Sequence, residues 1–280
     1  MKYGVNTFIW RSEFQAGDVS LFPRIREGGF DGVEIPVINP GSLPSAVIRR
    51  GLEDHGLECT ACSVLPGGLS LISDDASVRR RALDQLKSCV EAAAIIGARI
   101  LAGPLYSPVG YLSGVRRTRE EWQRLVECYR ALSGFLAGHG VTIAIEPLNR
   151  FETYFLNTVA DAVTLCGEIG VPEVGILFDT FHANIEEKDV AFACRAAGPH
   201  LKHVHACEND RGTPGTGHVD WPGVFASLRA AGYDGWLVIE SFGFSLGELS
   251  SAAAIWRDLA PTAESIAFDG VQFLRRNVQC

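Results

Sequence analysis

Short runs of β-branched and other apolar residues alternate with amphipathic stretches along the whole chain, and this alternation constrains the fold most strongly. We expect eight strands, which begin near Tyr3, Gly32, Leu57, Arg99, Val141, Val174, Leu201 and Trp236. Helical periodicity is clear between several of them, over 78–96, 120–139, 158–170 and 221–232. A regular strand–helix alternation leaves two architectures, a closed (β/α)8 barrel or a doubly wound open sheet.

Two further features of the chain favour the barrel. A doubly wound sheet would carry a glycine-rich phosphate turn after the first strand, and the segment Val5–Trp10 has none. The chain of 280 residues also has no linker and no shift in composition. We therefore predict an α/β fold with a single TIM barrel domain over residues 1–280. Glycines that end four helices are expected to be left-handed C-caps: Gly97, Gly140, Gly170 and Gly232.

Four of the predicted strands end in a carboxylate or an imidazole: Glu146, Asp179, His205 and Glu240. The C-terminal ends of barrel strands face one mouth, so we expect these side chains to converge. Three carboxylates in close contact repel one another unless a cation neutralises them. Oxygen-rich ligation with one imidazole favours Mn²⁺, Mg²⁺ or Co²⁺ over structural zinc. The pattern predicts a divalent metal site, whereas any one of the four alone could be a salt-bridged residue at a strand end.

The composition argues against several classes of protein. A net charge of -8 lacks the basic footprint that nucleic-acid binding requires, and no apolar run is long enough to predict a membrane span. The N-terminus runs straight into a strand pattern without a secretion signal. The eight cysteines are scattered, and the lone Cys59–Cys62 CxxC motif falls within a predicted strand. We expect reduced thiols in a cytoplasmic protein.

Several motifs resemble those of one known family. They are Gly103-Pro-Leu-Tyr106, Glu146-Pro-Leu-Asn-Arg-Phe-Glu152, Phe178-Asp179-Thr-Phe-His182, His203-Val-His205 with Glu208-Asn-Asp-Arg211, and Ile239-Glu240-Ser-Phe. In order and interval they are similar to the ketose 3-epimerases, the D-tagatose 3-epimerase and D-allulose (psicose) 3-epimerase group of the xylose-isomerase-like TIM barrels. The resemblance covers nearly the whole chain.

The resemblance implies a metal-dependent isomerase that inverts C3 of free ketohexoses or ketopentoses, of the D-tagatose, D-fructose/D-allulose or L-ribulose type. The ion, usually manganese, would be held by Glu146, Asp179, His205 and Glu240 and would bind O2 and O3 of the sugar. Glu146 and Glu240 would also be the catalytic acid/base pair, one on each face of C3, with a cis-enediolate between the two proton transfers. This fits the chemistry, because inverting a carbon beside a carbonyl needs a proton-transfer group on each side.

The resemblance also places residues around the sugar. Glu152, His182 and Arg211 match residues that hydrogen-bond the O1–O3 end of the substrate, and Arg211 lies in a loop rich in glycine and proline, 208–217. The chain departs from well-known members where the O4–O6 end is read. There we expect Asn6, Phe8 and Tyr106 to line the pocket, with Trp10 and Tyr111 as further aromatic candidates. Family members are commonly homodimers or homotetramers.

Other interpretations stay open from the sequence. Glu34 at the end of the second strand either orients a metal ligand or is a buried partner of an Arg or His. We interpret His218 and Asp220 as structural. The alternative reaction is aldose–ketose isomerisation, of the hydroxypyruvate or inosose type, on the same barrel. A DNA-repair endonuclease is disfavoured by the negative net charge of the chain. A non-catalytic sugar-binding barrel would bind the sugar without exchanging its C3 proton.

Overall fold

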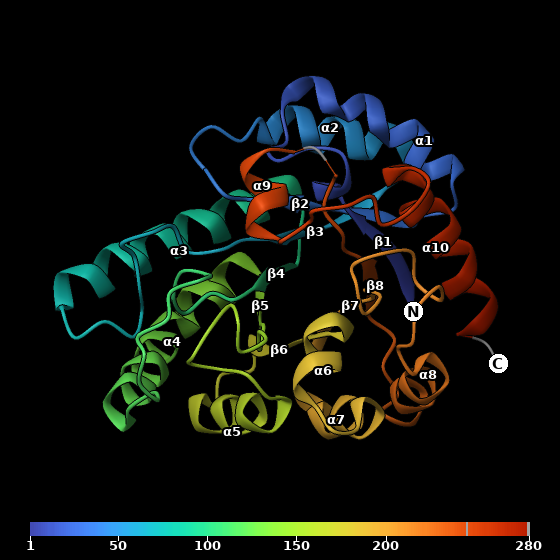
Figure 1. Cartoon of the computed structure of the whole chain (residues 1–280). Coiled ribbons are helices and arrows are strands. Elements are labelled where there is room, and N and C mark those ends of the chain that lie inside the picture. Colours follow the sequence, from blue (N-terminus) through green and yellow to red (C-terminus); the bar gives the residue numbers. More distant parts are fainter. Residues whose placement is uncertain (245, 279–280) are drawn as a thin grey trace.

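Eight parallel strands close into a barrel in sequence order, with β1 paired to both β2 and β8 (Figure 1). The computed structural model describes residues 1–244 and 246–278. The predicted (β/α)8 barrel is confirmed, and each strand begins at, or one residue from, the expected position. The strands are β1 (Lys2–Asn6), β2 (Gly32–Pro36), β3 (Glu58–Cys62), β4 (Ile100–Gly103), β5 (Thr142–Ile145), β6 (Val174–Asp179), β7 (Leu201–His205) and β8 (Trp236–Ile239).

Helices form the outer ring of the barrel (Figure 1). The four helices expected from periodicity are present as α3, α4, α5 and α8. The described α-helices are α1 (Phe22–Glu27), α2 (Ser45–His55), α3 (Ala76–Ile96), α4 (Arg119–His139), α5 (Val159–Ile169), α6 (Thr180–Glu186), α7 (Val190–Ala197), α8 (Trp221–Ala230), α9 (Glu248–Ala252) and α10 (Ala263–Asn277). Short 3-10 helices are η1 (Thr7–Ile9), η2 (Ala16–Leu21) and η3 (Gly198–His200).

Local sequence explains where the long helices begin and end. Thr118 and Glu121 form a capping box at the start of α4, each side chain accepting a hydrogen bond from the other's backbone N–H. Gly97, Gly140 and Gly170 are left-handed C-caps of α3, α4 and α5, as predicted. Gly232 is also left-handed, but it follows the cap of α8, which is Ala231.

The core has two parts, one on each side of the barrel wall. Most buried apolar side chains lie in one cluster that includes Leu101 and Ile143. Ala102, Ala144 and Leu177 form a separate small cluster. Because successive strand residues point to opposite faces, the second cluster fills the barrel interior while the first packs under the helices. The polar side chains lie further along the same strands, at the C-terminal end of the barrel.

Two predictions about the chain as a whole can be compared with the structure. Every described cysteine is a free, buried thiol, and Cys59 and Cys62 lie in β3 as predicted. Cys280 lies outside the described residues. Over the described part of the chain, none of the helices combines the length and the apolar character that a membrane span needs.

Candidate active site

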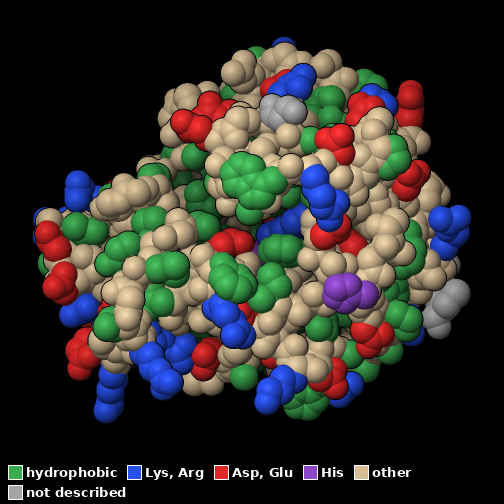
Figure 2. All heavy atoms as spheres, in the orientation of Figure 1, with side chains coloured by type: hydrophobic (Ala, Val, Ile, Leu, Met, Phe, Trp, Pro, Cys, Tyr) green, Lys and Arg blue, Asp and Glu red, His purple; other side chains and the backbone are tan. Residues whose placement is uncertain are grey.

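The four predicted metal ligands converge at the C-terminal end of the barrel. Asp179 and His205 are register partners on β6 and β7, while Glu146 and Glu240 directly follow β5 and β8. One ligand atom from each of the four lies within 4.8 Å of the others, and all four side chains are buried. In the space-filling view, acidic and basic atoms are visible near the centre of this face, between hydrophobic side chains (Figure 2).

The imidazole of His205 lies among three buried carboxylates. Its Nε2 lies 2.8 Å from Oε1 of Glu34. Its Nδ1 lies 3.4 Å from Oε2 of Glu240 and 3.8 Å from Oδ2 of Asp179. Among the described residues this buried Nδ1 has no hydrogen-bond partner. A buried imidazole nitrogen that faces carboxylate oxygens and has no hydrogen-bond partner of its own among the described residues fits a site for a divalent cation.

Glu34 is a further buried carboxylate of this region, outside the four predicted ligands. Its side chain is fully buried at the end of β2, and both His203 and His205 contact it at 2.8 Å. Burial alone would raise the pKa of Glu34, but the two histidines and their hydrogen bonds lower the pKa well below its usual value. Glu34 is therefore ionised. The structure confirms Glu34 as a buried partner of histidine, and one of its two partners, His205, is a predicted ligand.

The ligand carboxylates interact strongly with one another. Burial, followed by the charges of Glu240 and Asp179, raises the pKa of Glu146 well above its usual value. Burial also acts to raise the pKa of Asp179, but Arg211 and His205 outweigh it and hold that pKa below its usual range. Ionisation of all the carboxylates in one buried space is therefore unfavourable, and a bound cation would relieve their repulsion.

Arg211 reaches into the same cluster from the loop after β7. Its Nη1 donates to Oδ2 of Asp179 and Oε2 of Glu240, each at 2.8 Å. The guanidinium also stacks on two rings, 4.0 Å from the centroid of Phe181 and 5.3 Å from that of Phe242. Arg211 has a positive φ of 67°, a conformation that its loop must impose on a residue with a Cβ. The side chain that was predicted to bind substrate is therefore held between two aromatic rings.

His182 and Glu152 are joined by one asparagine. Nδ1 of His182 accepts a hydrogen bond from the backbone N–H of Asn149 at 3.1 Å, and the Asn149 amide donates to Oε1 of Glu152 at 2.8 Å. Nε2 of His182 faces the site, 3.5 Å from Oε1 of Glu146 and 3.1 Å from Nη2 of Arg211. Burial lowers the pKa of His182 to about 3, so its imidazole is neutral.

The residues expected at the far end of the sugar are more deeply buried than a pocket wall requires. Asn6 is fully buried, and its amide donates to Glu34 at 2.9 Å. Tyr106 is also fully buried, and its hydroxyl donates to the backbone oxygen of Glu146 at 3.1 Å. Phe8 stacks on Phe242 with centroids 5.6 Å apart. Asn6 and Tyr106 therefore support the ligand cluster, and direct contact with a sugar stays a prediction for all three.

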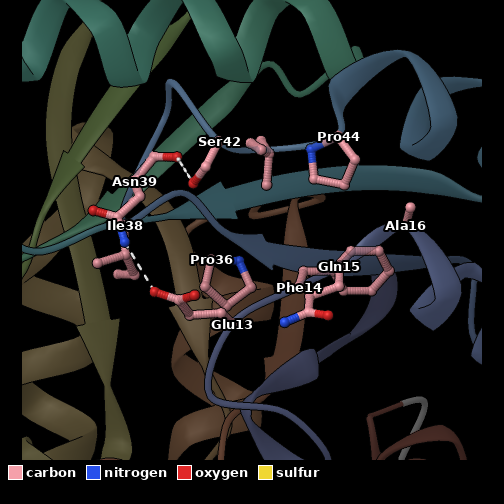
Figure 3. Close-up of a pocket in the computed structure, with 10 residues that line it drawn as sticks. Glu13, Phe14, Gln15, Ala16, Pro36, Ile38, Asn39, Ser42 and Pro44 are labelled. Carbon is pink, nitrogen blue, oxygen red and sulfur yellow. Dashed lines mark hydrogen bonds between the residues drawn. The ribbon is translucent and has the colours of Figure 1, made fainter.

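The remaining sequence candidates lie away from the four ligands. Trp10 packs against Phe268 of α10, and Tyr111 is exposed beside Tyr154. His218 is exposed, and Asp220 caps the start of α8, which agrees with a structural role for Asp220. A hollow on the same face lies between the loops after β1 and β2, where Asn39 donates to Glu13 at 2.8 Å (Figure 3).

Three residues of this region were not singled out from the sequence. Strand periodicity could have found His203, because it lies two residues before His205 and therefore on the same face of β7. Asn149 lies inside the motif that begins at Glu146, but its two contacts depend on how the loop folds. Cys207 donates its thiol to the backbone oxygen of Glu240 at 3.1 Å, and no sequence signal indicates that contact.

The comparisons with known proteins agree with this geometry. The model of the xylose isomerase-like TIM barrel family matches residues 22–276. A probable ketose 3-epimerase of Synechocystis sp. is 40% identical over 279 residues, which cover 100% of this chain and 97% of that protein. An L-ribulose 3-epimerase of Mesorhizobium japonicum is 32% identical over 92% of this chain and 88% of its own length.

A solved structure gives the same result. The crystal structure of a D-allulose 3-epimerase from Methylomonas sp., in complex with D-allulose, is similar with a TM-score of 0.92 and 27% identity. The match covers 99% of this chain and 97% of that one. The chain therefore belongs to the xylose isomerase-like TIM barrel family, in its ketose 3-epimerase group of isomerases.

Proposed function

We propose that this protein interconverts the C3 epimers of free ketohexoses or ketopentoses, of the D-tagatose, D-fructose/D-allulose or L-ribulose type. The observation that carries the proposal is the pair of buried glutamates, Glu146 and Glu240, which follow β5 and β8 and meet at one cluster with Asp179 and His205. Relatives named for L-ribulose and D-psicose cover nearly the whole chain and support the substrate class.

Glu146, Asp179, His205 and Glu240 would hold a divalent metal ion, with Mn²⁺ as the first choice and Mg²⁺ or Co²⁺ as alternatives. The ion would supply Lewis-acid polarisation of the sugar oxygens beside C3. The unpartnered Nδ1 of His205 and the surrounding carboxylate oxygens support this assignment. Asp179 and His205 act as ligands only, whereas the two glutamates have a second role in moving the proton.

Glu146 and Glu240 act as the acid/base pair on opposite faces of C3. One carboxylate takes the C3 proton, and the other carboxylic acid returns a proton from the other side, so each needs access to a different protonation state. Burial and the charges of Glu240 and Asp179 raise the pKa of Glu146 in the metal-free protein, and a bound cation would oppose that shift. Each positioned group is expected to contribute roughly 10²–10⁴-fold to the rate.

Glu152, His182 and Arg211 orient the O1–O3 end of the sugar. His182 is a neutral imidazole fixed by Asn149, and Arg211 is fixed by its two aromatic neighbours, so both present polar atoms with little freedom. Restricting these side chains before substrate binds lowers the entropy lost on binding. Asn6, Phe8 and Tyr106 are proposed to act nearer the O4–O6 end.

Product identification tests the reaction. Tagatose, fructose, allulose, sorbose, ribulose and xylulose are each incubated with the protein and Mn²⁺, and the products are identified by NMR. A ketose inverted at C3 supports the proposal. An aldose product would instead establish aldose–ketose isomerisation, the alternative reaction on the same barrel.

One variant tests the assignment of roles. Glu240→Gln should retain sugar binding yet lose exchange of the C3 proton, whereas full loss of binding would indicate that Glu240 acts only as a ligand. The resemblance further predicts a homodimer or homotetramer, and the scattered cysteines favour the cytoplasm. Sedimentation analysis of the purified protein measures the first of these predictions.

A further inference from the structure

We propose that Glu34 is a positioning residue, which fixes the imidazole of His205 so that Nδ1 carries the lone pair that faces the metal site. The inference rests on the metal site of the proposed function and adds a residue outside the four ligands. It concerns metal binding, so it is testable without any sugar.

The carboxylate of Glu34 is fixed by four hydrogen bonds. Its side chain is fully buried, and each carboxylate oxygen accepts two hydrogen bonds. Oε1 accepts from Nδ2 of Asn6 (2.9 Å) and Nε2 of His205 (2.8 Å), while Oε2 accepts from Oγ1 of Thr60 (2.9 Å) and Nε2 of His203 (2.8 Å). The carboxylate therefore has a single orientation, set from β1, β3 and β7.

This orientation determines the tautomer of His205. An ionised carboxylate only accepts hydrogen bonds, so Nε2 of His205 carries a hydrogen, and an imidazole that holds a metal ion through Nδ1 has no other ring hydrogen on nitrogen. Nδ1 then carries the lone pair, and this is the atom that lies 3.4 Å from Glu240 without a hydrogen-bond partner in the described chain. A metal-bound histidine commonly donates its other ring N–H to a carboxylate, which fixes the ring and strengthens the ligand.

Glu34 is linked to a second ligand through Asn6. The Oδ1 atom of Asn6 accepts the backbone N–H of Phe8 at 2.9 Å, which assigns the opposite end of the amide as the donor. That donor, Nδ2, lies 2.9 Å from Oε1 of Glu34 and 3.4 Å from Oε1 of Glu240. Glu34 and Asn6 together therefore position a nitrogen ligand and an oxygen ligand of the same ion.

Thr60 provides the matched control. Its hydroxyl donates to Oε2 of Glu34, on the side of the carboxylate away from the His205 contact. Thr60→Val removes one of the four hydrogen bonds to Glu34 and keeps the side-chain shape. A loss caused only by disturbing a buried polar network should appear in both Thr60→Val and Glu34→Gln. A loss caused by the contact with His205 should appear in Glu34→Gln alone.

The experiment is a titration of the metal-free protein with Mn²⁺, in which free Mn²⁺ is followed by its EPR signal. Glu34→Gln should weaken Mn²⁺ binding about 10–100-fold, and Thr60→Val should change it by less than about threefold. The visible spectrum of bound Co²⁺ should shift in Glu34→Gln and stay unchanged in Thr60→Val. Unchanged affinity in Glu34→Gln, or an equal loss in both variants, would overturn the proposal.

A measurement on the unmodified protein does not depend on whether a variant folds. With ¹⁵N-labelled histidine and diamagnetic Mg²⁺, NMR should find the proton of His205 on Nε2 and none on Nδ1. A proton on Nδ1 overturns the proposal, as does a protein that binds no divalent ion. If the protein binds Mn²⁺ and shows this tautomer yet epimerises no ketose, the proposed function fails while the role of Glu34 stands.

Discussion

The loop that carries Arg211 is anchored by one fully buried carboxylate, that of Glu208. Two hydrogen bonds to this carboxylate come from the far end of the loop, and a third comes from the first residue of α8. Its oxygens accept hydrogen bonds from Nε1 of Trp221 (2.9 Å) and from the backbone N–H groups of Gly215 (2.7 Å), Val219 (3.0 Å) and Asn209 (3.1 Å). Replacing this carboxylate tests whether the loop depends on it.

Glu208→Gln should destabilise the protein by about 3–6 kcal/mol. The amide oxygen can replace one carboxylate oxygen, but the NH₂ group must face the two N–H donors that bond the other. Two hydrogen bonds to a charged group, each worth about 1.5–3 kcal/mol, are then lost. Because a domain is stable by only about 5–15 kcal/mol, the effect should be large. A displaced Arg211 should also raise the KM for the ketose.

The assay is denaturant-induced unfolding at a fixed metal concentration, with Glu168→Gln as the matched control. Glu168 accepts the same kind of hydrogen bond, from Nε1 of Trp122 at 2.8 Å, but it is exposed. Its substitution should change the free energy of unfolding by no more than about 0.5 kcal/mol. A loss below about 1 kcal/mol in Glu208→Gln, or equal losses in the two variants, would refute the anchoring role.

Three further outcomes are expected. Tyr106→Phe removes the hydroxyl that donates to the backbone oxygen of Glu146. It should reduce the free energy of unfolding by about 0.5–1.5 kcal/mol, and no loss in a denaturant titration would contradict that contact. Gly103→Ala should reduce the free energy of unfolding by roughly 3 kcal/mol, because φ of Gly103 is 131° and a Cβ would lie 2.2 Å from the backbone oxygen of Ser63. A thermal melt like that of the unmodified protein would be inconsistent with this packing. Exhaustive chelation should abolish turnover, and added Mn²⁺ should restore it, whereas full activity in a metal-free sample would remove the role of the ion.

The fold and the ligand set were predictable because both follow from periodic patterns. Strand runs and helix periodicity located the barrel elements, and the C-terminal ends of parallel strands share one face of the barrel. Glu146, Asp179, His205 and Glu240 therefore had to approach one another once the barrel was predicted. Their convergence needed no knowledge of any loop.

The supporting contacts were not predictable, since they depend on distances between elements. The sequence left Glu34 undecided because a strand-end carboxylate can orient a metal ligand or pair with a buried Arg or His. Its contacts depend on how β1, β3 and β7 pack around it. Arg211 was assigned to a loop, but its contacts with Asp179 and Glu240 depend on how that loop folds, including the positive φ of Arg211 itself. Asn6 was expected to line the substrate pocket, but its side-chain amide donates a hydrogen bond to Glu34 inside the barrel mouth.

The central claim is that Glu146 and Glu240 move the C3 proton of a ketose between opposite faces. The most direct measurement is NMR of a single turnover in D₂O, with the best ketose of the panel and Mn²⁺ present. The account predicts a product that is inverted at C3 and carries one deuterium there, because the returning proton comes from a carboxyl group in exchange with solvent. An inverted product without deuterium at C3, or an aldose, would contradict it.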